Sequence, residues 1–190
     1  MKKERICIMK KIVSLLLLLA IVLSFAACSK SDPNVPTGYK LASDAELCDY
    51  TLVVPDVWVS ESTKSNYTIA TISSADKCTV SVAKLENVYA TTVAEYWELC
   101  KAEYGFLQNF AAVEEGAKAS VGTGETLKNG YRYVFTGDYN GKSYKYMQIF
   151  LVHGNAFASS LYCITYTALA DHYDSHLETI NSVLGYFSFR

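Results

Sequence analysis

The chain of 190 residues has little of what several common functions require. It contains three prolines and three histidines, no C-x-x-C pair, no G-x-S-x-G segment and no glycine-rich phosphate-binding loop. Paired C-x-x-C cysteines supply many zinc and thioredoxin-like redox sites, and the two glycine motifs mark hydrolase and nucleotide-binding folds. We therefore expect a protein that is not an enzyme and that holds no cofactor.

Basic charge is also scarce after the first 27 residues. Residues 1–27 hold five of the 17 Lys and Arg residues and one of the 19 Asp and Glu residues, so the rest carries 12 basic and 18 acidic side chains. The resulting net charge of −6 offers no electrostatic footprint for nucleic acid and no polybasic patch for anionic lipid. We expect no nucleic-acid partner, and membrane attachment would need a lipid anchor.

The N-terminus carries a hydrophobic leader. Five basic residues lie before residue 12, and residues 12–27 are apolar except for two serines and end in Ala26-Ala27. This order is typical of a secretory signal, and an apolar run of about 16 residues is short for a membrane span of ~20. We predict export of the chain, with residues 1–27 as the signal peptide.

The end of the leader, Phe25-Ala26-Ala27-Cys28, resembles the lipobox of bacterial lipoproteins, with Phe25 where Leu is usual. The resemblance implies that the Cys28 thiol receives a diacylglyceryl group and becomes the new N-terminus. Two acyl chains hold a protein on a bilayer stably, at ~0.8 kcal/mol per buried CH₂. The prediction is a lipid anchor at Cys28 on the extracytoplasmic side of the cell membrane. An uncleaved signal anchor with a free thiol is the alternative.

The rest of the chain divides into a tether and a domain. Residues 28–38 contain the acylated cysteine, two prolines and small polar residues, which favours a flexible tether. Residues 39–190 are long enough for one globular domain with a real core. All 15 tyrosines follow Cys28, and a tyrosine-rich, proline-poor composition favours β-sheet.

The domain contains four further cysteines, Cys48, Cys78, Cys100 and Cys163. Four cysteines allow three pairings, and their spacing does not choose among them. We expect Cys100 and Cys163 to be small buried hydrophobic side chains. A Cys48–Cys78 disulfide is an open alternative in an exported chain, because both residues lie near predicted strand starts.

Hydrophobic periodicity places the secondary structure. It predicts strands at residues 49–54, 67–72, 79–85, 112–121, 131–139, 142–151 and 156–168, with a loop at 61–66 and a turn at 153–155. Thr92 and Glu95 form a capping-box pattern that begins a helix, which we expect to end near Asn109-Phe110. A closing helix is expected over residues 171–184.

Asn140-Gly141 is the strongest short hairpin signal in the chain. A two-residue type I′ loop pairs Tyr139 with Lys142 and, further along, Phe135 with Tyr146, which puts many aromatic side chains on one face. We expect this aromatic face to pack under a helix. A platform for a ligand or sugar is the alternative.

The order of these elements resembles the PsbP-like superfamily. The likeness rests on six segments, residues 50–58, 92–99, 129–131, 131–151, 162–168 and 183–189. It implies an α+β fold with one antiparallel sheet of about six or seven strands and helices packed on it. No catalytic residues belong to this pattern, so the resemblance implies a fold more than a function.

Two residue pairs remain as candidate chemistry. His172 and His176 are four residues apart on the predicted closing helix and so face one way, which makes them weak candidates for a metal site. Glu114 and Glu115 are neighbours on a predicted strand, where adjacent side chains point apart, so shared acid–base work is not expected.

The sequence favours a membrane-anchored, non-catalytic binding or assembly module of the cell envelope. Its expected contacts are the lipid bilayer, through acylated Cys28, and an unidentified envelope protein or small ligand. The alternative is a metal-dependent sensor or enzyme that uses His172 and His176.

Overall fold

The computed structural model describes residues 35–64, 66–73, 76–85, 92–155 and 158–190. Residues 36–190 form one compact unit. The predicted signal peptide, Cys28 and the tether up to residue 34 lie outside the described residues. Within the described part, no helix is both long enough and apolar enough to cross a bilayer.

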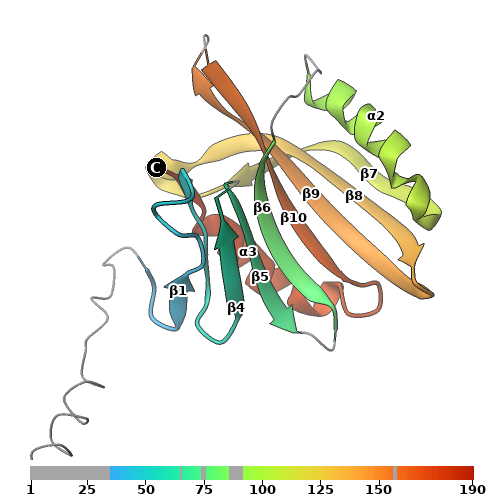
Figure 1. Cartoon of the computed structure of the whole chain (residues 1–190), viewed down its shortest axis with the longest axis horizontal. Coiled ribbons are helices and arrows are strands. Elements are labelled where there is room, and N and C mark those ends of the chain that lie inside the picture. Colours follow the sequence, from blue (N-terminus) through green and yellow to red (C-terminus); the bar gives the residue numbers. More distant parts are fainter. Residues whose placement is uncertain (1–34, 65, 74–75, 86–91, 156–157) are drawn as a thin grey trace, which may run out of the picture. The chain divides into compact units, whose positions relative to one another are not determined.

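The domain is an α+β fold built on a large antiparallel sheet (Figure 1). Its strands are β1 (Tyr39–Leu41), β2 (Tyr50–Thr51), β3 (Val53–Pro55), β4 (Val59–Thr63), β5 (Tyr67–Ser73), β6 (Cys78–Leu85), β7 (Gln108–Val121), β8 (Lys128–Tyr139), β9 (Lys142–Asn155), β10 (Ala158–Leu169) and β11 (Ser188–Phe189). The helices are α2 (Val93–Glu103) and α3 (Leu177–Gly185), with 3-10 turns η1 (Tyr104–Phe106), η2 (Gly124–Thr126) and η3 (Asp174–His176).

Seven strands form the main sheet in the order β4-β5-β6-β10-β9-β8-β7. Every pairing in it is antiparallel, which confirms the predicted fold class. Two small sheets, β1 with β3 and β11 with β2, lie beside it. The pairing of β6 with β10 brings together strands that are about 80 residues apart and that no local pattern connects.

The β8–β9 hairpin has the predicted register, since Tyr139 pairs with Lys142 and Phe135 pairs with Tyr146. Asn140 and Gly141 both have positive φ angles, 51° and 72°, as a type I′ turn requires. Because side chains alternate along a strand, this register sends one set of hairpin side chains to each sheet face. The aromatic set therefore lies together on one face, as predicted.

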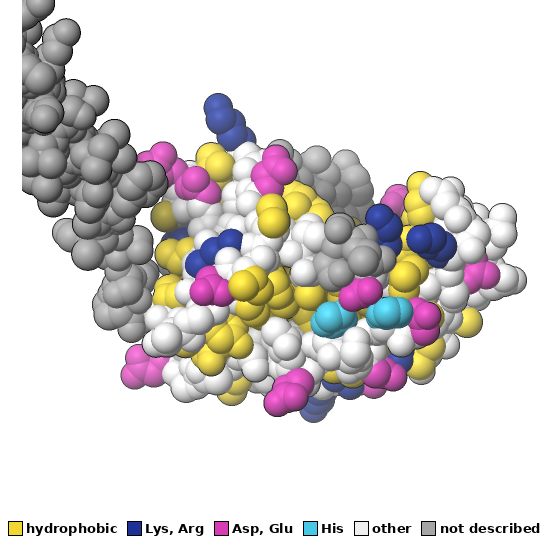
Figure 2. Space-filling model, turned by 90° about the horizontal axis from the view of Figure 1, so that it is seen from below, with side chains coloured by type: hydrophobic (Ala, Val, Ile, Leu, Met, Phe, Trp, Pro, Cys, Tyr) yellow, Lys and Arg dark blue, Asp and Glu magenta, His cyan; other side chains and the backbone are white. Residues whose placement is uncertain are grey.

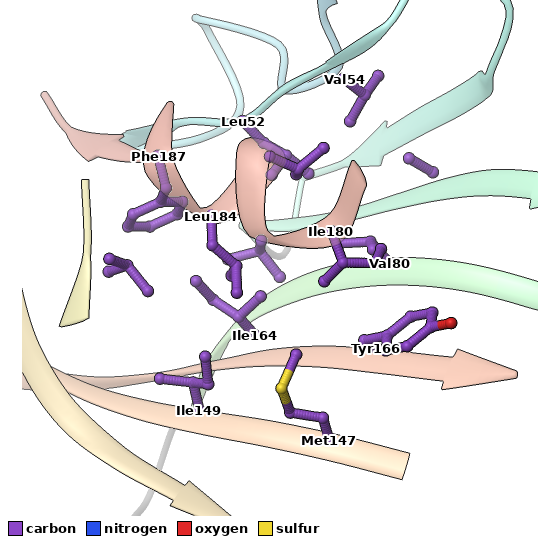
Figure 3. Close-up of a cluster of buried hydrophobic side chains, with 14 of the residues drawn as sticks. Leu52, Val54, Val80, Met147, Ile149, Ile164, Tyr166, Ile180, Leu184 and Phe187 are labelled. Atoms are coloured by element: carbon purple, nitrogen blue, oxygen red, sulfur yellow. The ribbon is translucent and has the colours of Figure 1, made fainter. Parts of the chain in front are cut away.

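Helix α3 covers the other face of the sheet. Ile180, Val183 and Leu184 are buried and pack into a large core that includes residues of β5, β6, β9 and β10 (Figure 3). Phe187, just after the helix, is fully buried and stacks on Tyr50 with ring centroids 5.8 Å apart. This core contains residues of the small sheets, the main sheet and α3, so it connects these parts of the domain.

Several predicted strand boundaries were wrong. The predicted loop at 61–66 overlaps the last three residues of β4, which is polar because it is an edge strand, exposed on one side. The predicted turn at 153–155 belongs to β9, which runs to Asn155. The single strand predicted at 49–54 is split, since β2 pairs with β11 and β3 pairs with β1.

Both predicted helices were too long. Helix α2 ends at Glu103, and η1 with Gly105 replaces its expected last turns, so that Leu107 is extended and β7 begins at Gln108. Glycine weakens a helix, and burial of Leu107 against Gly137 holds the chain in its extended path. The closing helix begins at Leu177, after the separate turn η3.

Candidate functional site

Helix α2 is fixed over the β8–β9 half of the sheet by a buried tryptophan. The Thr92 hydroxyl accepts the backbone N–H of Glu95 at 3.1 Å, so the predicted cap begins the helix. Trp97 is 1% exposed and stacks on Tyr133 with ring centroids 4.6 Å apart. Its indole N–H donates to Glu115 at 3.2 Å. The prediction that the aromatic hairpin face packs under a helix is confirmed for this half of the sheet.

A groove lies where α2 meets the other half of the same sheet face, formed by β5, β6 and β10. It has a volume of about 260 Å³. Its lining residues are Tyr67, Ser81, Ala83, Leu85, Tyr96, Cys100, Glu103, Tyr104, Gln148, Phe150, Cys163 and Thr165. The strands β5, β6 and β10 contribute mainly small side chains, whereas α2 and η1 contribute larger ones. One side of the groove is therefore formed by α2 and η1, and its floor is formed by the small side chains of the sheet.

Two phenols of the groove, those of Tyr96 and Tyr104, are neutral. Burial raises the pKa of Tyr96 and that of Tyr104 well above the usual range, so both keep their protons at neutral pH. The Tyr104 hydroxyl donates to Gln148 Oε1 at 2.9 Å. Tyr104 also stacks on Phe135, with ring centroids 4.9 Å apart, which holds this ring in place.

The thiols in the groove are unreactive. Burial raises the pKa of Cys163 to about 12 and also raises the pKa of Cys100. A thiolate is the nucleophilic form of cysteine, and neither residue provides it at neutral pH. Cys163 is buried in the aromatic cluster under α2, which confirms the expectation of a small buried hydrophobic side chain. Cys100, on α2 itself, packs against the same cluster but is only partly buried.

The alternative of a Cys48–Cys78 disulfide was wrong. All four cysteines in the described part are free thiols. Cys48 Sγ lies 3.4 Å from the Thr68 hydroxyl, and the Cys78 thiol donates to the Tyr166 hydroxyl at 3.6 Å. The two cysteines therefore contact different residues of the core on the α3 side. Both lie near the start of a strand, but two strand starts need not be neighbours in the folded sheet.

The two candidate histidines do not share a helix. His172 lies in the turn after β10, and His176 ends η3 at the cap of α3. Asp76, from the β5–β6 turn, reaches both, at 3.2 Å from His172 Nδ1 and 3.5 Å from His176 Nε2. Figure 2 shows histidine and acidic side chains together on this face of the domain. Among the described residues, no group of three or more His, Cys, Asp or Glu residues is arranged to hold a metal ion.

Glu114 and Glu115 face different partners, as expected for neighbours on a strand. Arg132 donates to both carboxylate oxygens of Glu114, at 2.6 and 3.0 Å. Glu115 accepts from Trp97 and from Lys101, each at 3.2 Å. The Arg132 guanidinium outweighs partial burial and lowers the pKa of Glu114. These acids therefore stabilise β7 and α2 and do not form a shared acid–base site.

The groove itself could not be found from the sequence. Its residues come from four strands, β5, β6, β9 and β10, and from α2 and η1, and their meeting depends on β6 pairing with β10. The alternation in β6 and β10 was visible, but it does not show which face of each strand stays uncovered. Asp76 was missed for the same reason, since it lies in a different part of the chain from the histidines.

The comparisons with known proteins give fold likenesses only. No family model and no curated protein matches the chain. Among solved structures, the chain is similar to LpqN of Mycobacterium tuberculosis, a protein involved in cell envelope biogenesis. The identity is 16% and the TM-score is 0.45, and the match covers 81% of this chain and 79% of LpqN. It is similar to the Ran-binding protein Mog1p of Saccharomyces cerevisiae at 13% identity and a TM-score of 0.49, covering 77% and 90%.

Cyanobacterial PsbP from Synechocystis sp. PCC 6803 is a third neighbour, at 13% identity and a TM-score of 0.46, covering 82% of this chain and 94% of PsbP. The family that the sequence resembles is thus represented among the structural neighbours. At these identities the likeness concerns the fold alone. The function has to be argued from the groove and from the N-terminal leader.

Proposed function

We propose that this protein is a non-catalytic binding module, anchored by lipid at Cys28 to the outer face of a bacterial cell membrane, and that it binds its ligand in the groove beside α2. The observation that carries the proposal is the groove itself, set between α2 and a half-sheet that no described helix covers. Concave sites with a few placed polar groups are where proteins bind small molecules.

The groove's chemistry supports binding over catalysis. Its two thiols and the phenols of Tyr96 and Tyr104 keep their protons at neutral pH, and Glu103 is the only acid among the described lining residues. A general acid–base reaction needs titratable groups with matched pKa values, and a covalent one needs an activated nucleophile. The lining residues supply neither arrangement.

The anchor is tested by membrane fractionation. Cys28→Ala should move the full chain from the membrane fraction to the soluble fraction, because acyl chains hold it there. Cys7→Ala is the matched control, since it removes a leader cysteine without touching the lipobox, and it should leave fractionation unchanged. Membrane retention of Cys28→Ala would contradict the lipid anchor.

Binding in the groove is tested without assuming a ligand. Native mass spectrometry of the full chain, purified from its own membranes, should show an additional bound mass. Ser81→Trp, which fills the groove floor, should lose this mass, whereas Thr71→Trp, on the same sheet face but outside the lining, should keep it. Retention of the mass in Ser81→Trp would contradict the groove as the binding site.

The alternative, a metal-dependent sensor at His172 and His176, has one observation in its favour, the approach of Asp76 to both rings. A real site needs a complete ligand set with second-shell support. We expect Zn²⁺ to leave the melting temperature unchanged. A Zn²⁺-induced rise that His176→Ala abolishes would favour the sensor instead.

A further inference from the structure

We propose that the occupant of the groove beside α2 is a neutral carbohydrate, one or two sugar rings of a glycan. The inference rests on the proposed binding function and names its ligand class. Four properties of the lining support it: its charge, its free hydrogen-bonding groups, one unused aromatic ring, and the closed backbone of its floor.

The charge of the groove disfavours anions. No lysine or arginine is among its described lining residues, and Glu103 adds a negative charge at one side. A phosphate or carboxylate would therefore enter without a counter-charge and beside a like charge, which costs free energy at close range. A neutral ligand meets no such penalty.

The groove offers hydroxyl and amide groups that suit a sugar. Among the described residues, the hydroxyls of Tyr67 and Ser81 make no hydrogen bond to the protein, and Gln148 uses its carbonyl oxygen on Tyr104 and keeps its amide nitrogen for another partner. Hydroxyls donate and accept, whereas the amide nitrogen donates only. Sugar hydroxyls also do both, so they can satisfy this mixed set.

Tyr67 supplies the aromatic surface. Tyr96 already packs edge-on against Phe150, at 5.5 Å between ring centroids, and Tyr104 stacks on Phe135 at 4.9 Å. Within the described part of the chain, the ring of Tyr67 has no aromatic neighbour and lines the groove. An aromatic face carries partial negative charge, which attracts the slightly positive C–H groups on the flat side of a sugar ring.

The floor of the groove argues against an extended peptide. The backbones of β5, β6 and β10 are paired to each other across the floor, for example Tyr67 with Ala83 and Cys163 with Ala83. A peptide strand binds by adding to a free sheet edge, where unpaired backbone groups are available. On this face its own N–H and C=O groups would lose water without gaining ladder partners.

The same floor argues against a lipid tail. Ser81, Thr165 and Gln148 are polar, and covering them with hydrocarbon would remove their water without replacing its hydrogen bonds. The volume of about 260 Å³ lies just below the ~300–1,000 Å³ of pockets for drug-sized ligands, which fits one or two rings.

The test is a titration of the full chain with maltotriose, cellotriose and chitotriose in a polyoxyethylene detergent, since glycoside detergents would compete. Binding is followed by calorimetry and by ligand-observed NMR. We expect at least one trisaccharide to bind with a Kd below ~10 mM. Ser81→Trp should weaken that binding at least tenfold, and Gln148→Ala should weaken it about fivefold, the loss expected from one hydrogen bond of ~1 kcal/mol.

Thr71→Trp is the control for an added tryptophan on this sheet face and should keep the wild-type Kd. Circular dichroism of each variant shows whether it is folded, and the Gln148→Ala result keeps the proposal falsifiable if Ser81→Trp unfolds. The proposal is overturned if no trisaccharide binds below ~10 mM. It is also overturned if glucose 6-phosphate binds more tightly than glucose, or if decanol or a neutral hexapeptide binds in the groove instead.

The two proposals fail separately. A native bound mass that Ser81→Trp removes, together with no trisaccharide binding, would overturn the sugar and leave the binding function standing. Absence of any Ser81-dependent bound mass, with no trisaccharide binding, would overturn both.

Discussion

The two faces of the main sheet are covered to different degrees. On one face, α3 and the segment after it complete a continuous core that reaches from β5 to β7 and includes residues of the small sheets. On the other face, α2 rests on an aromatic cluster over β8 and β9, and the surface of β5, β6 and β10 continues beyond it as the groove. The first face is thus closed by a continuous core, and the second leaves the groove open beside α2.

The difference follows from the side chains that each face receives. Toward α3, β6 and β10 present Val80, Val82, Ile164 and Tyr166, all buried. Toward α2, the same strands present smaller or more polar residues, such as Ser81 and Thr165. Each of these strands therefore contributes to both the core and the groove, because its side chains alternate between the two faces of the sheet.

The largest effect should come from the sealed face. Phe187→Ala removes a fully buried ring that stacks on Tyr50, and we expect the free energy of unfolding to fall by ~3–5 kcal/mol. Chemical denaturation measures it. Phe106→Ala is the control, since Phe106 is 62% exposed, and it should change stability by less than ~1 kcal/mol. Equal losses in the two variants would contradict the assignment of stability to the α3 face.

A smaller effect is expected where η1 meets the hairpin. A Cβ on Gly137 would lie 3.0 Å from Leu107 Cβ, so Gly137→Ala should lower the free energy of unfolding by about 1–2 kcal/mol through overpacking. A Cβ on Gly105 would meet no atom within 4 Å. Gly105→Ala should therefore be neutral or slightly stabilising in the same denaturation measurement. A neutral Gly137→Ala would show that Leu107 can move and that the end of α2 is less fixed than described.

The smallest effect concerns the sheet end near β11. Burial opposes ionisation of Asp49, but hydrogen bonds from Tyr162 at 2.6 Å and Lys84 at 2.9 Å outweigh it and lower the pKa of this carboxyl. A lowered folded pKa contributes stability that is present above the unfolded value of ~3.9 and is lost as pH falls through the folded value.

Asp49→Asn should therefore cost up to ~1 kcal/mol at pH 7, a limit set by partial exposure, and the cost should shrink as the pH falls below ~4. Unfolding curves of wild type and variant between pH 7 and pH 2 measure it. Asp56→Asn, at an exposed aspartate, is the control and should change the free energy of unfolding at pH 7 by less than ~0.5 kcal/mol. A cost for Asp49→Asn that is constant with pH would contradict the ion-pair account.

Local patterns predicted the parts of the fold that depend on neighbouring residues. Asn140-Gly141 determined the hairpin register because the turn geometry allows few alternatives. The helix start at Thr92 was also predicted, because a cap acts within one turn. The end of α2 was not, because Leu107 leaves the helix to pack against Gly137, a residue 30 positions later.

The candidate site lay beyond such patterns. β4 was missed because an exposed edge strand is polar and resembles a loop in sequence. The groove depends on the order of strands in the sheet, and the approach of Asp76 to His172 depends on which turn lies beside which. Contacts of this kind are decided by tertiary packing, which one sequence alone does not show.

The most direct test of the contrast between the faces uses two adjacent residues of β10. Ile164 is buried under α3 (Figure 3), and Thr165 lines the groove on the opposite face. In chemical denaturation, Thr165→Trp should stay within ~1 kcal/mol of wild type, because the groove has room for the ring. Ile164→Trp should lose ~3 kcal/mol or more, because a packed core does not have that room. Equal destabilisation by the two substitutions would show that both faces are packed alike, which contradicts an open groove.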